Sequence, residues 1–330
     1  MVHRQMQREH AALIVDTGYL SKKCISYIQL KRVLRGLDYT TFNQINSSYF
    51  GKEVAQMENL WYAIDGKELR GSIDKAKGEK RGENVVCMVA HQSLESEVIG
   101  YYDGAKESEK KVVKSYFDAQ QVLRGSYSVD ALHCSSALME SIESKKGTYL
   151  VQVKGNQAKL LEDCKHIAKY LKAKETFEEQ EKGHGRKETR QAFLYDLPTA
   201  CLDKRWANSG IKSLVVIKRE RYRVKTGEKS EQTAFYVSNQ VVEGQTGQEL
   251  FQAARFHWGV ESNNWVRDKQ LGEDDIKCKG NEAKSIAAFI NVALNLFRKQ
   301  NKDHNISQLR EELIYDRDKI YPLFDTNIFL

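Results

Sequence analysis

The sequence contains few of the residues that separate domains or anchor a chain in a membrane. Its 330 residues include only two prolines, so no proline-rich linker divides independent domains. No run approaches the roughly 18 apolar residues of a membrane-spanning helix, and the N-terminal segment lacks the apolar core and cleavage site of a signal peptide. We therefore expect a cytoplasmic protein with no membrane partner.

Paired cysteines are also missing. The six cysteines are scattered singly and form no Cys-x-x-Cys pair, which argues against a zinc site. An even number of cysteines does not establish disulfides in a chain of this length, and free thiols in a reducing compartment are the simpler expectation.

Charge is present in abundance and is unevenly distributed. The formal net charge is +7 and the sequence pI is about 8.9, which weakly favours polyanionic partners. The most basic stretch lies between residues 175 and 240. Two β-patterned segments there flank the turn sequence TGEK and predict a long hairpin.

The order of apolar patterns predicts an α/β fold. Three short apolar runs, at 60–64, 84–91 and 96–103, precede an alternation of helical and strand patterns that continues to about residue 173. We expect a mixed sheet flanked by helices, with a helix over 108–125 and a loop at Asn43–Ser48. A second helix is expected over 135–147, with serine at its start and Gly147 as its stop. The predicted organisation is an N-terminal helical segment (1–55), a core (56–174 and 241–300), a β-rich basic insertion (175–240) and a C-terminal tail (301–330).

Two of the predicted strands deliver a carboxylate. The apolar run 60–64 leads directly into Asp65, and a second short strand is followed by Asp130. Adjacent carboxylates repel, and one would bind a proton unless a cation lay between them. Mg²⁺ or Mn²⁺ suits such oxygen ligands. The alternative is that Asp65 and Gly66 form a two-residue hairpin turn.

A third carboxylate is predicted on a later helix. Glu261 falls on a stripe of apolar residues at helical spacing that we expect to face the core: Phe251, Ala254, Trp258 and Trp265. A glutamate in that position needs a partner, either a metal ion or a core arginine or lysine. Asp268, one heptad further along, is the main rival for the same role. Three carboxylates around two divalent ions support phosphoryl-transfer chemistry.

Five segments carry a family resemblance. The segments AIDGKELRGS, SVDALHCSS, YLVQVKGNQ, EKGHGRKETR and RFHWGVESNNWVRDKQLGED resemble, in this order and spacing, those of the H-repeat-associated insertion-sequence transposases. These are DDE transposases with a ribonuclease H-like core, and the resemblance spans roughly residues 25–298. It implies that Asp65, Asp130 and Glu261 form the catalytic triad and hold two Mg²⁺ or Mn²⁺ ions. It also implies a β-rich insertion before the helix that carries the glutamate.

Further residues are candidates for DNA contact. Lys154, Asn156 and Gln157 follow a predicted strand and could bind a phosphate and a base or sugar edge; the alternative is a solvated turn with Asn156 as a helix cap. Arg219, Arg221, Arg223 and Lys225 alternate along one predicted strand, so all four should point the same way. A phosphate backbone would relieve their repulsion, although a solvated face is the alternative. The basic candidates are Arg219, Arg221, Arg223, Lys225, His184, Arg186, Lys187 and Arg190.

Three residues are candidates for supporting roles around the carboxylates: His133, His257 and Asp268. His133 follows Asp130 by three residues, where a metal ligand, a donor to the transition state or a hydrogen-bonding bystander would each fit. His257 and Asp268 stand where related transposases carry arginine and lysine. Trp258 and Trp265 are expected in the core, with stacking on a flipped base as the alternative.

The expected function is therefore metal-dependent cleavage of double-stranded DNA at the ends of a mobile element and strand transfer into a target. Because two ends must meet, we expect a homodimer in the nucleoid. Three alternatives remain. They are a two-metal nuclease that does not join strands, an inactive transposase that only binds DNA, and a two-carboxylate glycosidase, which the basic insertion disfavours.

Overall fold

The computed structural model describes residues 23–54, 60–104, 106–183, 185–300 and 305–316, together with residue 7. Within these residues, no helix is both long and apolar enough to span a membrane. All six cysteines are free thiols, as expected.

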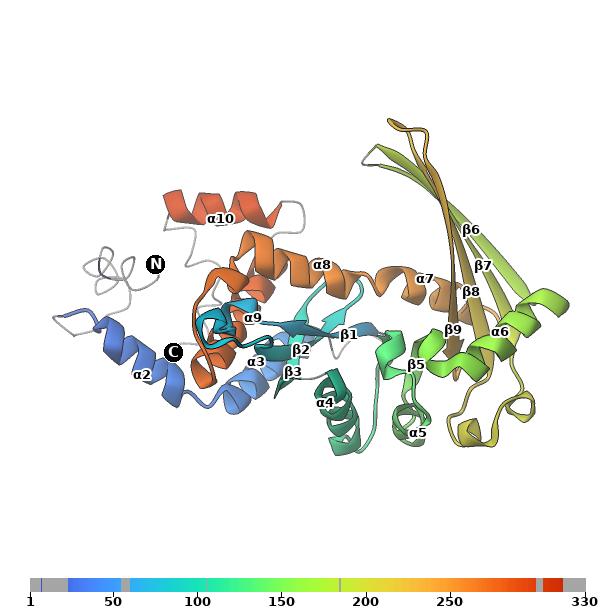
Figure 1. The fold of residues 1–330 in the computed structure, drawn as a ribbon, viewed down its shortest axis with the longest axis horizontal. Helices are drawn as coiled ribbons and strands as arrows, with labels where there is room; N and C mark the ends of the chain where they lie inside the picture. Colours follow the sequence, from blue (N-terminus) through green and yellow to red (C-terminus); the bar gives the residue numbers. More distant parts are fainter. Residues whose placement is uncertain are drawn as a thin grey trace.

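The centre of the fold is one mixed sheet of nine strands in the order β3-β2-β1-β4-β5-β9-β8-β7-β6 (Figure 1). Strands β1, β4 and β5 run parallel, and the remaining neighbours pair antiparallel. The predicted three-strand opening and the mixed sheet are confirmed, and the architecture is consistent with a ribonuclease H-like fold. The strands are β1 (Trp61–Glu68), β2 (Glu83–Ala90), β3 (Ser96–Asp103), β4 (Ser126–Val129), β5 (Thr148–Val153), β6 (Glu175–Gly183), β7 (Arg186–Asp196), β8 (Ser213–Arg223) and β9 (Lys229–Ser238).

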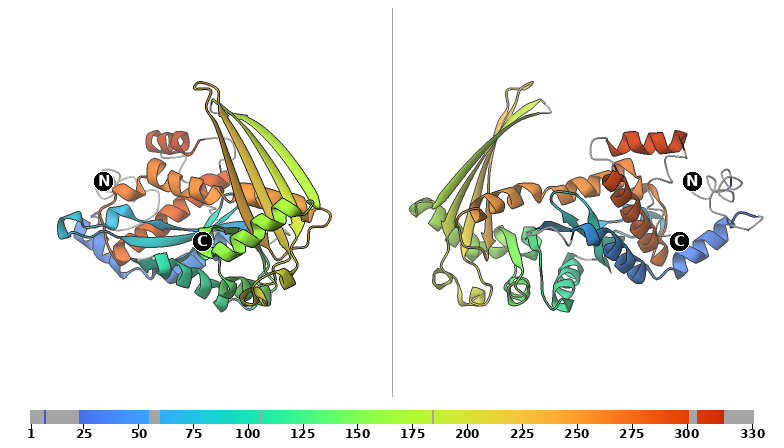
Figure 2. Two further views of the ribbon diagram at one scale, coloured as in Figure 1. Left: turned by 45° about the vertical axis from the view of Figure 1, so that its right-hand side comes forward. Right: turned by 180° about the vertical axis from the view of Figure 1, so that it is seen from behind.

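Helices cover both faces of this sheet (Figures 1 and 2). On one face, α4 (Lys106–Ala119), α5 (Ser136–Ser144) and α6 (Ala158–Tyr170) contribute Phe117, Met139 and Leu160 to the largest apolar cluster. On the other face lie α7 (Thr246–Phe256), α8 (Gly259–Trp265) and α9 (Asn281–Gln300). Phe251 of α7 packs against β8 and β9, whereas Val260 of α8 packs against β1 and β2.

The predicted basic insertion forms the antiparallel strands β6–β9 and does not make a separate layer. Strand β9 pairs with β5 of the core from Leu150↔Ser238 to Val153↔Phe235, so the insertion lengthens the core sheet. The far ends of these strands extend beyond the helices as a curved arm (Figures 1 and 2). The predicted hairpin of β8 and β9 is confirmed, and the exact domain boundaries stay a prediction.

The N-terminal region contains α2 (Tyr27–Gly36) and α3 (Tyr39–Val54), which pack against α9. Helix α2 starts with a capping box, in which the Ser26 Oγ accepts from the Gln29 N–H and the Gln29 side chain accepts from the Ser26 N–H. The loop predicted at Asn43–Ser48 is wrong, because α3 continues through it. Contacts of α3 with α9 and β3 stabilise this polar stretch as a helix.

Two predicted helix ends also differ from the structure. Helix α4 ends at Ala119 and not near Gly125, so the chain has six residues to reach β4. Helix α5 starts with the predicted serine cap at Ser135, but Lys146 and not Gly147 adopts the left-handed conformation after it, with φ of 64°.

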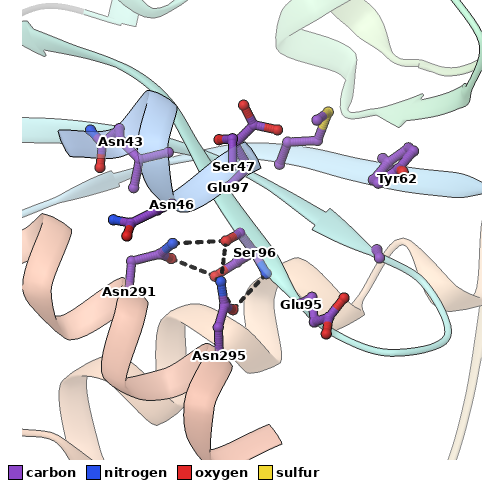
Figure 3. Close-up of a pocket in the computed structure, with 12 residues that line it drawn as sticks. Asn43, Asn46, Ser47, Tyr62, Glu95, Ser96, Glu97, Asn291 and Asn295 are labelled. Atoms are coloured by element: carbon purple, nitrogen blue, oxygen red, sulfur yellow. Dashed lines mark hydrogen bonds between the residues drawn. The ribbon is translucent and has the colours of Figure 1, made fainter. Parts of the chain in front are cut away.

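Helix α9 is fixed to the edge strand β3 by a buried polar network (Figure 3). The Asn291 and Asn295 side chains donate to the Ser96 carbonyl at 2.7 and 2.8 Å, and the Ser96 N–H donates to the Asn295 Oδ1 at 2.9 Å. These bonds satisfy backbone groups at the start of β3. They fix the position of α9, and α9 in turn contacts the segment after α8.

Candidate active site

Asp65 and Asp130 each follow the last paired residue of two neighbouring parallel strands, β1 and β4. The ladder between β1 and β4 ends at Ile64↔Val129. Both carboxylates therefore lie at one edge of that ladder, side by side along the sheet. The hairpin turn considered for Asp65 and Gly66 is wrong, because both residues continue β1 and pair with β2.

The structure holds these two carboxylates by neutral donors. The Asp130 Oδ1 accepts from the Leu132 N–H at 2.8 Å and caps the 3-10 helix η3 (Ala131–His133). The Asn264 Nδ2 of α8 donates to the Asp65 Oδ2 at 3.1 Å. Helix α8 thus contacts the Asp65 carboxylate through Asn264, which follows Glu261 by three residues.

The electrostatics of Asp65 reveal a concentration of negative charge. Burial raises the pKa of Asp65 to about 7, and Glu109, Asp130 and Glu261 add to the increase. Burial also raises the pKa of Glu261, with a further contribution from Asp130, whereas nearby Lys154 lowers it. The three predicted catalytic carboxylates are therefore close enough to influence one another.

Glu261 is exposed, and the stripe on which it lies is buried at Phe251 and Ala254 but exposed at its two tryptophans. Trp258 and Trp265 are 49% and 55% exposed, so the expectation that they lie in the core is wrong. Helix α7 ends at Phe256 and α8 starts at Gly259, and the buried residues of α8 are Val260 and Asn263. The prediction that the stripe faces the core is therefore confirmed for Phe251 and Ala254 and wrong for Trp258 and Trp265.

In the described part of the chain, no three Asp, Glu, His or Cys side chains come close enough together to hold a metal ion as they stand. The convergence of Asp65, Asp130 and Glu261, called the acidic triad below, on shared ions therefore stays a prediction. No ion pair among the described residues involves a member of the acidic triad, whereas Asp268 pairs with Lys67 at 2.6 Å.

Asp268 belongs to a separate group of charged residues, which surrounds Lys67 of β1 and which we call the Lys67 cluster. Its members are Lys67, Arg267, Asp268, Glu273 and Asp274. The Lys67 Nζ lies 2.6, 3.0 and 3.2 Å from the carboxylates of Asp268, Glu273 and Asp274. Arg267, which is fully buried, donates to both oxygens of Glu273 at 3.0 and 2.6 Å. Because the Asp268 carboxylate is ion-paired with Lys67, Asp268 is a weaker candidate than Glu261 for a metal ligand.

The two predicted supporting histidines are placed differently. His133 is buried and its Nε2 lies 3.0 Å from the Oε1 of Glu109. The His257 Nδ1 lies 2.9 Å from the Ser128 Oγ, which also contacts the His91 Nε2 at 2.9 Å. Burial lowers the pKa of His257 to about 4 and that of His91 to about 3, so both rings are neutral at pH 7.

The turn after β5 supports the loop that carries Asp130. The Asn156 and Gln157 side chains donate to the carbonyls of Ala131 and Cys134 at 2.6 and 2.7 Å. Neither side chain caps α6, so the capping alternative for Asn156 is wrong. Lys154 is exposed at the end of β5, on the side of Glu261. Contact of these three residues with DNA stays a prediction.

The basic face of the arm is confirmed in part. Opposed pairs Arg186↔Arg223 and Arg190↔Arg219 place four arginines on one face of β7 and β8, and Arg221 lies between them. Lys187 alternates to the opposite face. Lys225 lies in the turn beyond β8, so the expectation that it alternates along the same strand as the arginines is wrong. His184 lies outside the described residues.

Acidic residues on the same face were not anticipated. Glu188, which is buried, contacts Arg190 and accepts from the Arg221 Nε at 3.2 Å. Glu181 accepts from Arg190 at 3.1 Å. Repulsion among the arginines is thus relieved within the protein, and it no longer requires DNA.

A groove of about 570 Å³ runs between this face and the helices α7 and α8. Its walls include Arg190, Arg219 and Arg221 on one side and Phe256, Trp258 and Ser262 on the other. The Arg219 guanidinium lies 5.5 Å from the centre of the Trp258 ring. Ser262, which lines the groove, follows Glu261 in α8.

Three contributors to the site were missed in the sequence: Glu109, Asn264 and Lys67. Glu109 precedes the fully buried Val113 and Phe117 by four and eight residues, so the spacing along α4 places it on the core face. Asn264 follows Glu261 by three residues, which is the helical neighbour position. No local signal identifies the partners of Lys67, because they lie about two hundred residues further along the chain.

Comparison with known proteins agrees with this arrangement. The family described as "Transposase DDE domain" matches residues 59–296. The putative transposase YncI of Escherichia coli O157:H7 is 30% identical over 282 residues, which are 82% of this chain and 70% of that protein.

Two relatives in Escherichia coli K12 carry the H-repeat name. The H repeat-associated putative transposase YhhI is 30% identical over 243 residues, 71% of this chain and 63% of that protein. The H repeat-associated putative transposase YbfD is 31% identical over 146 residues, 43% of this chain and 56% of that protein. The chain thus spans less than two thirds of these two relatives. The matched domain covers most of the chain, and the chain belongs to the DDE transposase family, as an enzyme of the DDE type related to the H repeat-associated transposases.

Proposed function

We propose that this protein is a DNA transposase that cleaves phosphodiester bonds at element ends and transfers the strands into target DNA, with Asp65, Asp130 and Glu261 holding two Mg²⁺ or Mn²⁺ ions. The observation that carries the proposal is the register Ile64↔Val129, which brings Asp65 and Asp130 together beside the helix of Glu261.

The residues at the site fit hard divalent cations. The donor set consists of carboxylates, without the thiolates that select softer metals. The acidic triad has no ion-pair partner among the described residues, and the raised pKa of Asp65 reflects negative charge that a cation would neutralise. Bound ions would activate a water or a 3′-hydroxyl and stabilise charge on the phosphate.

The chain's own residues would then position the substrate. Asn264 orients the Asp65 carboxylate, and Asn156 and Gln157 hold the loop after Asp130. Lys154, exposed next to Glu261, is placed to contact a phosphate. The groove along the basic face would hold double-stranded DNA leading to the acidic triad. Because two ends react together, we propose a homodimer acting in the nucleoid.

Cleavage of an end-labelled duplex carrying the sequences that flank the gene tests this proposal. With Mg²⁺, wild-type protein should release a 3′-hydroxyl end, and Asp65→Asn, Asp130→Asn and Glu261→Gln should each abolish cleavage. Glu162→Gln on α6 is the matched control and should cleave normally. Normal cleavage by any of the three variants would contradict the assignment of that residue.

The products distinguish transposition from simple cutting. A supercoiled plasmid added as target should become joined to the labelled ends. Cleavage without joining would support the two-metal nuclease. DNA binding that is unaffected by Mg²⁺ and produces no cleavage would support the DNA-binding alternative.

A further inference from the structure

Glu109 is a buried carboxylate that lies next to the acidic triad but on the opposite face of the sheet. It comes from the first turn of α4 and is 4% exposed. The Tyr102 hydroxyl donates to its Oε2 at 2.7 Å, and the His133 Nε2 lies 3.0 Å from its Oε1. A buried carboxylate is costly unless it serves as an acceptor or balances a charge.

The strand β1 leaves room for this carboxylate. A Cβ built at Gly66 would lie only 2.5 Å from the Cδ and Oε2 of Glu109. A side chain at position 66 would therefore displace the Glu109 carboxylate. The glycine after Asp65 thus allows close approach of a second negative charge to the site.

Glu109 also contacts the segment that follows β4 and carries Asp130. His133 is the last residue of η3, the short helix that Asp130 caps, and the His133 N–H donates to the Asp130 carbonyl at 3.2 Å. The chain of contacts runs from Glu109 through His133 to the backbone of Asp130. One buried side chain therefore contacts the β1 backbone beside Asp65 and the loop that holds Asp130.

We propose that Glu109 is a positioning residue of the metal site: through Gly66 and His133 it sets the spacing of Asp65 and Asp130, and its charge strengthens their affinity for divalent cations. This inference rests on the proposed function. Partners behind a ligand commonly change metal affinity when they are replaced, although they do not touch the metal.

Mn²⁺ binding tests the inference without relying on catalysis. Free Mn²⁺ is measured by electron paramagnetic resonance during titration of the full chain. Glu109→Gln keeps the size of the side chain and removes its charge, and we expect Mn²⁺ to bind about tenfold more weakly. The control is Glu97→Gln, which removes a carboxylate from β3 at the small cavity of Figure 3 and should leave Mn²⁺ binding unchanged.

Gly66→Ala provides a second variant in which Glu109 itself is intact. It should weaken Mn²⁺ binding in the same direction, because the new methyl group displaces the Glu109 carboxylate. If Glu109→Gln does not fold, as judged by circular dichroism, this variant decides the question. Affinity within twofold of wild type in the folded variants would overturn the inference. A wild-type protein that binds no Mn²⁺ would instead overturn the proposed function.

Discussion

The Lys67 cluster and the acidic triad both start on β1, at residues two positions apart, yet their charges are balanced differently. In the Lys67 cluster, two buried cations face three carboxylates at distances between 2.6 and 3.2 Å. In the acidic triad, Asp65 has a neutral amide partner and no ion pair among the described residues. The chain can neutralise buried acids from within, and it does so in only one of the two groups.

The difference separates structural acids from candidate metal ligands. The Lys67 cluster joins β1 to the segment that follows α8, which includes a π-helix over Val266–Gln270. It thereby fixes the helix that carries Glu261. The acidic triad keeps an excess of negative charge, as the pKa of Asp65 near 7 indicates. A divalent cation is the natural counterion for such an excess.

The largest expected effect is from removal of the Lys67 charge. Lys67→Met leaves three carboxylates with only Arg267 to balance them, and we expect a loss of about 3–5 kcal/mol in the free energy of unfolding. Urea unfolding at pH 7 measures this loss. A loss below about 1 kcal/mol is no more than an exposed ion pair contributes, and it would show that the Lys67 cluster is not balanced by buried ion pairs.

Removal of the Asp65 charge should have the opposite sign. The folded state raises the pKa of Asp65 from 3.8 to about 7, so folding is progressively disfavoured as the pH rises through this window. Asp65→Asn should therefore be more stable than wild type at pH 8. The full pKa shift corresponds to roughly 4 kcal/mol, and this figure is an upper limit because the Asp65 side chain is partly exposed.

Unfolding at pH 4 provides the internal control for Asp65→Asn, because the carboxyl is then largely protonated in the folded state and the gain should shrink. A variant that is less stable than wild type at pH 8 would show that Asp65 is neutralised by the chain.

Divalent cations should stabilise one group and not the other. At ten times its Kd and at pH 8, Mg²⁺ should increase the stability of wild-type protein by about 1.4 kcal/mol. Asp130→Asn should lose this increase. Thermal unfolding with Mg²⁺ and then with excess chelator measures it, and an equal increase in Asp130→Asn would place the ion elsewhere.

The smallest expected effect concerns Asp268. Asp268→Asn removes one of three carboxylates around Lys67, and we expect a cost of about 1 kcal/mol. DNA cleavage and the response to Mg²⁺ should persist, because Lys67 still contacts Glu273 and Asp274. Loss of cleavage in a folded Asp268→Asn protein would move the third ligand from Glu261 to Asp268.

The sequence was informative where periodicity and strand order carry the signal. The apolar run before Asp65 and the short strand before Asp130 predicted a carboxylate at the end of each of two strands. The register places both just beyond the ladder between β1 and β4, although β1 itself continues to Glu68. The predicted hairpin of β8 and β9 follows from a turn signal between two β patterns. Helical spacing also identified the buried positions Phe251 and Ala254, but it did not show that the same stripe is exposed at Trp258 and Trp265.

Other features depend on contacts that local patterns do not encode. Trp258 and Trp265 occupy apolar positions of a helical repeat, yet both are exposed, because the sheet covers α8 on the side of Val260 and Asn263. Lys67 is a charged residue in a strand, and its burial follows from partners that lie in the segment after α8. Glu181 reaches Arg190 of the arm from the neighbouring strand β6.

The sequence by itself determined the elements and the order of the carboxylates, because side-chain periodicity and turn chemistry act over a few residues. Only the tertiary structure decided which carboxylates are neutralised by the chain. Charge balance in a buried site depends on distances between residues such as Lys67 and Asp274, or Asp65 and Asn264, which lie far apart in the sequence and meet only after folding.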